Sequence, residues 1–198
     1  MLIHLRRSLV MAVICLVFFG FVYALVGTGV AQLFFRGQAD GSITANGSTL
    51  IGQNWSSPRF FHGRPDDTGP YAADPKQDVA GGDNPLVANG NSGESGASNL
   101  GPRSKVLVSN TKALVAYWHK MGVNPTPDLV TTSGSGYDPD ITPADAMVQI
   151  PMVSKATGIA PSTLRALINR ESNSAQWGFL GSSYINVLQL NTALSHLR

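Results

Sequence analysis

Residues 8–35 read "SLVMAVICLVFFGFVYALVGTGVAQLFF", a stretch without a charged residue. A helix needs about 20 predominantly apolar residues to cross the hydrocarbon core of a bilayer, so this stretch predicts a transmembrane helix. A cleaved signal peptide is the alternative, and its apolar core would cover only about 7–15 residues before a cleavage site of small residues. Here "QLFF" extends the run beyond "GTGVA", which favours an anchor that stays in the chain.

The charges beside this stretch predict its orientation. Arg6 and Arg7 precede the stretch, and Arg36 follows it. Because cytoplasmic flanks carry the excess of Lys and Arg, we expect residues 1–7 in the cytoplasm and the chain beyond the span on the periplasmic or extracellular side. The sequence thus predicts a single-pass protein of the cell (inner) membrane, with lipid around residues 8–35.

Small residues within the span are candidates for contacts with another helix. Gly20, Gly27 and Gly29 would let a neighbouring helix approach closely. Ordinary tolerance of glycine in membrane helices is the other interpretation. The single cysteine, Cys15, also lies in the span, where a lone thiol forms neither an internal disulfide nor a zinc cluster.

Beyond the span, we expect a linker over residues 36–49 and one small, loop-rich α+β domain over residues 50–198. Gly, Asn, Asp, Ser and Pro are frequent in residues 66–102, which show no sustained apolar period. This composition predicts a long irregular loop, which is uncommon in a compact domain unless it is functional or partly disordered.

Apolar periodicity and capping residues predict the elements of this domain. One helix is expected over residues 104–121. Another is expected to begin at Thr142, to be interrupted at Pro151 and to continue as a second piece to Gly158. The remaining predictions are a strand at residues 128–132, a helix near residues 162–169, and a final segment, "YINVLQLNTAL", that is compatible with a strand running into a helix.

The segment "LIGQNWSSPRFFHGRPD", residues 50–66, combines arginines, aromatic residues and a histidine. His62 with Asp66 or Asp67 would provide a general base, as in a membrane-anchored periplasmic hydrolase, but the sequence supplies no nucleophile with it. A half-buried His62 beside Phe60 and Phe61 is the simpler interpretation. A general periplasmic binding module is a third class.

Other chemical signatures are missing from the sequence. It contains neither a G-x-x-x-x-G-K-[ST] phosphate loop nor a G-x-S-x-G elbow. No second histidine lies near His62 at metal spacing, and the acidic clusters do not match a calcium loop. A formal net charge of +2 gives no argument for a nucleic-acid partner.

Four motifs, in this order, resemble those of one family. They are "GSTLIGQNWSSPRFFHGRP", "SNLGPRS", "VTTSGSGYDPDITPADAMVQIPMVSKATGI" and "GFLGSSYINVLQLNTAL". Together they resemble the C subunit of the Kdp-type potassium-transporting ATPases, from the anchor to near Leu194. The chain departs from the family at "INRESNSAQWGFLG", where an acidic-basic run with histidine is more usual, so no role is carried over for charges near residues 169–176.

The resemblance implies a non-catalytic accessory subunit of an ATP-driven, high-affinity potassium uptake complex. Its partners would be an ATP-hydrolysing pump subunit, a channel-like potassium-binding subunit and a small single-span subunit. It would stabilise their assembly and act as a catalytic chaperone that raises the ATP affinity of the pump. ATP and potassium would act at the level of the complex, and no cofactor or metal is expected on this chain.

The resemblance also implies roles for particular residues. An architectural and docking motif, with Phe60 and Phe61 as apolar anchors and the two arginines fixing orientation, would comprise Gln53, Arg59, Phe60, Phe61, Arg64 and Pro65. The expected orientation keeps the outer domain away from cytoplasmic ATP, so an effect on ATP affinity would pass through the membrane subunits. If nucleotide binds this chain directly, the candidate residues are Gln149, Ser98 and Asn99.

Overall fold

The structure is a computed structural model that describes residues 2–53, 55, 57–65 and 97–197. The chain divides into two units, residues 1–43 and residues 44–198. Asp66 and Asp67, the candidate partners of His62, lie outside the described residues. So does most of the predicted irregular loop.

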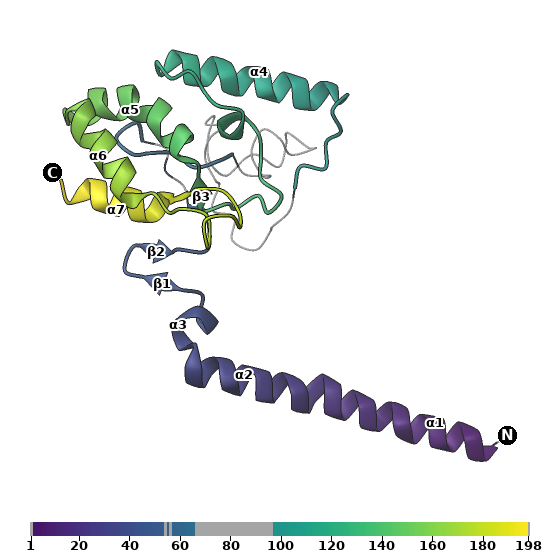
Figure 1. Ribbon diagram of the computed structural model, residues 1–198. Helices are drawn as coiled ribbons and strands as arrows, with labels where there is room; N and C mark the ends of the chain where they lie inside the picture. Colours follow the sequence, from purple (N-terminus) through teal and green to yellow (C-terminus); the bar gives the residue numbers. More distant parts are fainter. Residues whose placement is uncertain (1, 54, 56, 66–96, 198) are drawn as a thin grey trace. The chain divides into compact units, whose positions relative to one another are not determined.

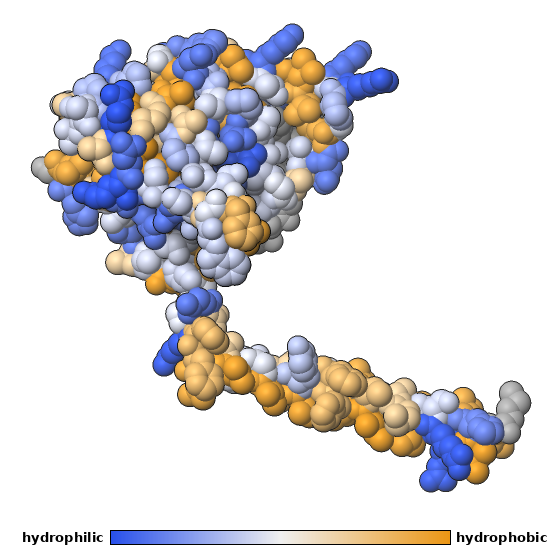
Figure 2. Space-filling model, viewed as in Figure 1, coloured by the Kyte–Doolittle hydropathy of each residue, from blue (hydrophilic) through white to orange (hydrophobic). Residues whose placement is uncertain are grey.

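The first unit is one long helix followed by a short one. The long helix covers Leu2–Phe34 and comprises α1 (Leu2–Cys15), a π-helical stretch (Leu16–Val22) and α2 (Tyr23–Phe34). It is long and apolar enough to cross a membrane, and Figure 2 shows apolar side chains along its length. None of its described residues is buried, as expected for a helix whose solvent is lipid. A single turn, α3 (Arg36–Ala39), follows.

The second unit is a helical domain with two small antiparallel sheets. It begins within β1 (Ile43–Thr44) and continues with β2 (Gly47–Ser48), α4 (Lys105–Lys120), β3 (Asp140–Ile141), α5 (Pro143–Thr157), α6 (Pro161–Glu171), β4 (Ile185–Asn186) and α7 (Val187–Ser195). β1 pairs with β2, and β3 pairs with β4 in the register Asp140↔Asn186 and Ile141↔Ile185. A single anchor followed by a mixed helix and sheet domain confirms the predicted α+β class.

Side-chain caps mark the starts of α4, α5 and α7. Ser104 accepts a hydrogen bond from the Leu107 amide at the start of α4. Thr142 and Asp145 form a reciprocal capping box at the start of α5, with distances of 2.8 and 3.2 Å. The Asn186 side chain accepts from the Gln189 amide at the start of α7. The prediction of a helix over residues 104–121 is confirmed. The final segment, which periodicity alone left open, is a strand running into a helix.

Two local predictions are wrong. Residues 128–132 are not a strand, because Asp128–Val130 forms a 3₁₀ turn. This turn buries the consecutive residues Leu129 and Val130, whereas a strand would direct them to opposite faces. α5 is also not interrupted at Pro151. Pro151 is exposed, while its neighbours Ile150, Met152 and Val153 are buried in the core and hold the helix on both sides of the proline.

The core lies among α4, α5, α6 and α7. Figure 1 shows α5, α6 and α7 gathered at one side of the second unit and α4 along another, and α6 packs against both α5 and α7. Apolar residues from these four helices and from Trp55, Phe60 and Phe61 meet in one cluster. Its largest fully buried side chains include Trp118 and Phe61, so the segment singled out from the sequence contributes to the core.

Candidate functional site

The backbone of Phe61 and His62 is held between two helices by side-chain amides. The Phe61 N–H donates to Asn191 Oδ1 at 2.9 Å, and Asn191 Nδ2 donates to the Phe61 carbonyl at 2.8 Å. In the same way, His62 N–H donates to Gln149 Oε1 at 2.8 Å and Gln149 Nε2 donates to the His62 carbonyl at 3.0 Å. Each carboxamide thus forms the pair of hydrogen bonds that a residue on a neighbouring antiparallel β-strand would form. We call Gln149 and Asn191 the carboxamide clamps.

Gln149 lies on α5 and Asn191 on α7, and both side chains are buried. Gln149 Nε2 also donates to the Asp145 carbonyl at 3.2 Å. Both ends of the Gln149 amide are therefore used inside the domain, and the structure gives this residue a role in holding the His62 backbone. Its contact with nucleotide stays a prediction.

The His62 ring is sealed inside the domain. Its side chain has no exposed surface, its Nε2 donates to the Ser57 carbonyl at 3.0 Å, and its ring lies 5.5 Å from that of Trp118. Burial lowers the pKa of His62 to about 4, although the Ser57 carbonyl acts in the opposite direction. The imidazole is neutral at pH 7. A general base has to reach the proton that it abstracts, and His62 is placed where no solvent-borne substrate reaches it.

Arg64 forms its ion pair inside the domain. Its Nη1 lies 3.3 Å from Asp138 Oδ2, and its Nη2 donates to the carbonyls of Thr132 at 3.0 Å and Thr131 at 3.4 Å. Both charged side chains are largely buried, with 21% and 28% of their surfaces exposed. Arg64 therefore ties the motif to the loop that leads into β3.

The other motif residues divide between core and surface. Phe61 and Pro65 are buried, so neither presents a side chain to a partner in this conformation. Phe60 is half-buried, with its ring 4.9 Å from that of Trp55, and Arg59 is exposed. Gln53 donates to the Ser48 carbonyl at 3.1 Å. Arg59 is thus the exposed residue of the motif, while Gln53, Phe60 and Arg64 are each partly exposed.

Gly52 fixes how the motif enters the domain. Its N–H donates to the Tyr137 carbonyl at 2.8 Å. A Cβ at this position would lie 2.8 Å from the Asp138 carbonyl oxygen, which is closer than real side chains approach. A glycine is needed here because the two backbones are in contact.

Ser98 and Asn99 lie in the turn before α4. Asn99 is exposed with φ 53°, and Ser98 Oγ accepts from the Leu100 amide at 3.5 Å. No hydrogen bond between described residues joins either of them to Gln149.

In the span, a Cβ on Gly27 or Gly29 would meet nothing within 4 Å, and one on Gly20 would meet Leu16 Cδ1 at 3.7 Å.

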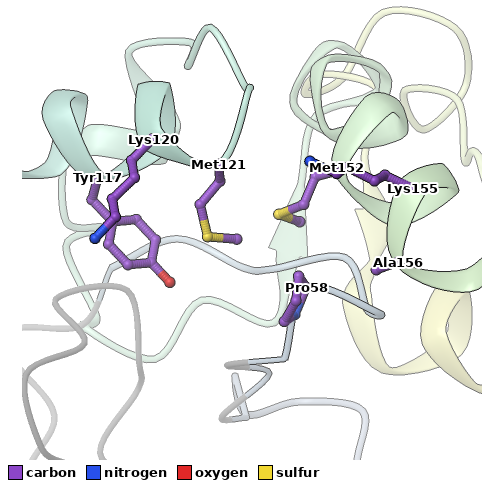
Figure 3. Close-up of a pocket in the computed structure, with 7 residues that line it drawn as sticks. All are labelled: Pro58, Tyr117, Lys120, Met121, Met152, Lys155 and Ala156. Atoms are coloured by element: carbon purple, nitrogen blue, oxygen red, sulfur yellow. The ribbon is translucent and has the colours of Figure 1, made fainter.

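A pocket of about 560 Å³ lies beside the motif. Figure 3 shows the side chains of Met121 and Met152 pointing toward one another across the gap between the end of α4 and α5. The pocket is lined by Pro58, Tyr117, Lys120, Met121, Met152, Lys155 and Ala156. Its volume is in the usual range of small-molecule sites. Within the described part of the chain, no group of three or more His, Cys, Asp or Glu side chains could hold a metal ion.

The carboxamide clamps and the pocket were not predicted from the sequence. A signal for the clamps exists, because Gln149 falls at helical spacing with the buried residues Ala146 and Val153, and Asn191 does so with Val187 and Leu194. A polar residue within an apolar stripe indicates a buried group that needs a partner. No such signal exists for the pocket, which combines separate parts of the chain.

Comparison with known proteins identifies the family. Residues 5–196 match the family described as KdpC, the K⁺-transporting ATPase c chain. The chain belongs to this family. The KdpC subunit of the potassium-transporting ATPase of Methylobacterium nodulans is 41% identical over 204 residues, covering 100% of this chain and 98% of its own. That of Gloeobacter violaceus is 41% identical over 186 residues, covering 90% and 88%, and that of Caulobacter vibrioides is 41% identical over 202 residues, covering 98% and 93%. The similarity to KdpC subunits thus includes both the apolar helix and the second unit.

Proposed function

We propose that this chain is the anchored, non-catalytic subunit of a potassium-transporting ATPase and that it stabilises the assembly of the complex. The observation that carries the proposal is the match to the KdpC family over residues 5–196. The proposed partners are an ATP-hydrolysing pump subunit, a channel-like potassium-binding subunit and a small single-span subunit. The sealed His62, which has no access to a substrate, agrees with a role in binding rather than in catalysis.

The motif supports this role as a rigid platform. The carboxamide clamps fix residues 61 and 62 to α7 and α5, and the Arg64–Asp138 pair fixes residue 64 to the loop before β3. A pre-organised surface loses less conformational freedom when a partner binds. Arg59, the exposed part of Phe60 and the neighbouring pocket at Pro58 form the docking surface in this proposal.

Purification of the full chain in mild detergent tests the proposal. Large membrane subunits should co-purify with it, and they are identified by mass. Arg59→Ala should reduce their yield, whereas Arg165→Ala, at an exposed position on α6, should not. Recovery of the chain without large membrane partners would contradict the proposal.

The proposal includes an orientation with the N-terminus in the cytoplasm and residues 44–198 on the periplasmic or extracellular side. Its support is the pair Arg6 and Arg7 before the span. In a Cys15→Ser background, Ser109→Cys should react with a membrane-impermeant thiol reagent on intact spheroplasts. Leu2→Cys should react only after lysis. The reverse pattern would refute this orientation.

We also propose that the chain raises the ATP affinity of the pump subunit. With the outer domain on the periplasmic side, this effect passes through the membrane subunits rather than through direct nucleotide contact. Gln149, Ser98 and Asn99 are the candidates for direct contact, and crosslinking with a photoreactive ATP analogue distinguishes the two routes. Labelling of the pump subunit alone is expected.

A further inference from the structure

Residues 173–184 form a hairpin with an exposed apolar tip, which we call the aromatic hairpin. Trp177 is 84% exposed, Phe179 77%, Leu180 51% and Tyr184 40%. The rings of Trp177 and Phe179 lie 6.5 Å apart. Large apolar side chains clustered at a surface mark an interaction site for a protein or a membrane.

The aromatic hairpin holds these side chains outward through its own backbone. Asn173 and Tyr184 exchange two hydrogen bonds of 2.8 and 3.0 Å, and Gln176 and Leu180 exchange two of 3.0 and 2.9 Å. Trp177 has φ 52°, which is uncommon for a bulky residue. The tip is therefore a defined turn that presents Trp177 to the surroundings.

The tip is uncharged and part of its backbone is hydrogen-bonded within the hairpin. The N–H groups of Gln176, Gly178, Phe179 and Leu180 donate within the hairpin itself. Residues 172–184 also contain no charged residue. Unsatisfied backbone groups and charges are the main costs of entering a bilayer; the tip carries no charge, and four of its N–H groups are already hydrogen-bonded within the hairpin.

The connection between the apolar helix and the second unit is short. The apolar helix ends at Phe34 and the outer unit begins at residue 44. A fully extended connection over residues 35–43 spans at most roughly 30 Å, so the tether keeps the domain close to the membrane surface. Trp and Tyr are the residues enriched where membrane and water meet.

We propose that the aromatic hairpin inserts into the interfacial layer of the bilayer, with Trp177, Phe179 and Leu180 among the lipid chains and headgroups. This contact would be a second point of attachment, in addition to the anchor. It rests on the membrane helix and the exposed tip, and it does not depend on the proposed role in the ATPase complex.

The test uses Trp177 as the reporter. The full chain is reconstituted in phosphatidylcholine vesicles with ordinary or brominated acyl chains, and iodide is placed on both sides of the membrane. Emission from Trp177 is obtained by subtracting the spectrum of Trp177→Phe, which leaves half-buried Trp55 and buried Trp118. We expect brominated lipid to remove most of the Trp177 emission and iodide to remove little of it.

Two variants control this measurement. Phe179→Ser with Leu180→Ser should reverse the pattern, so that iodide quenches Trp177 and brominated lipid does not. Val106→Ser with Val108→Ser removes exposed apolar residues from α4 and should leave the lipid quenching unchanged. Near-ultraviolet circular dichroism verifies that each variant is folded.

Two results would overturn the proposal. One is iodide quenching of wild-type Trp177 with no effect of brominated lipid. The other is protection of Trp177 that appears only when partner subunits are reconstituted with the chain, which would make the aromatic hairpin a protein-docking element.

Discussion

The side chains of Gln149 and Asn191 form the backbone hydrogen bonds that a neighbouring β-strand would otherwise form. Each satisfies both the N–H and the carbonyl of one motif residue. The arrangement lets residues 61 and 62 pass through the core between α5 and α7 without a sheet. It also makes the motif dependent on two polar side chains that are distant from it in sequence.

Removal of a clamp should therefore destabilise the outer domain. Gln149→Leu leaves the buried N–H and carbonyl of His62 without partners, at about 1–3 kcal/mol each. Thermal melting of the full chain, followed by near-ultraviolet circular dichroism, should show a loss of roughly 2–6 kcal/mol. Gln189→Leu, at an exposed position on the neighbouring helix, should have little effect. Equal melting of wild type and Gln149→Leu would contradict the clamp.

Arg64 is a second position where one residue joins two segments. Its pair with Asp138 is partly buried, so Arg64→Ala should cost between the ~0–1 kcal/mol of an exposed pair and the ~3–5 kcal/mol of a buried one. Arg64→Lys should restore only part of this, because an ammonium cannot reach the carboxylate and two carbonyls as the guanidinium does. Arg64→Ala should lower the assembled fraction and the melting temperature while leaving the ATPase rate per assembled complex nearly unchanged. Normal assembly and melting with abolished ATPase activity would instead assign Arg64 to the transport cycle.

His62 should make the outer domain less stable in acid. Its pKa falls from the usual 6.5 to about 4 on folding because the ring is buried. Between these values the unfolded chain binds a proton that the folded chain excludes, so the stability present above pH 6.5 is lost as the pH falls toward about 4. The loss is on the order of 3 kcal/mol, at 1.36 kcal/mol for each pKa unit.

The contribution of His62 is isolated by comparing melting curves over this pH range for wild type and His62→Gln. The variant should lack this part of the pH dependence, while His119→Gln, at an exposed histidine, should retain it. Identical pH profiles for wild type and His62→Gln would contradict the assignment.

At the scale of elements, α2 has one face built of small residues. Ala24, Gly27 and Ala31 are spaced to share a face of this helix, whereas Gly29 is two residues, and so about half a turn, from Gly27. Within this chain a side chain at Gly27 or Gly29 would meet nothing within 4 Å. Any effect of added bulk on the complex would therefore arise from a partner helix.

Gly27→Leu should accordingly loosen the complex in detergent while leaving membrane insertion intact, because the added side chain separates α2 from its partner. Gly29→Leu is the matched variant, with the same change on the other face. The measurement is the fraction of large subunits that co-purifies with each variant. An unchanged complex with Gly27→Leu would show that the glycines are passive.

The elements also show how far sequence patterns lead. The span, α4 and the start of α5 follow from composition, from periodicity and from capping residues that are close in sequence. The turn at Asp128–Val130 does not, because a β-branched run favours a strand while the tertiary structure supplies a different partner: Trp118 Nε1 donates to the Leu129 carbonyl at 3.1 Å. The predicted interruption at Pro151 is wrong for the same reason, since packing on both sides of the proline maintains α5.

At the scale of the whole molecule, the sequence predicts a motif over residues 53–65 but not the contacts that hold it. The carboxamide clamps join residues 87 and 130 positions apart, and the Arg64–Asp138 pair joins residues 74 positions apart. Local periodicity carries no information at such separations. The family resemblance was informative because it depends on ordered motifs over the whole chain, and the match over residues 5–196 confirms it.

The central claim is that this chain works by stabilising a potassium-transporting ATPase rather than by its own chemistry. The most direct measurement is potassium-stimulated ATP hydrolysis as a function of ATP concentration, per assembled complex, for the other subunits with and without this chain. The claim predicts that omission lowers the assembled fraction and raises the ATP concentration needed for half-maximal rate, and that adding the full chain back restores both. Equal assembly and an identical ATP dependence in the two preparations would contradict it.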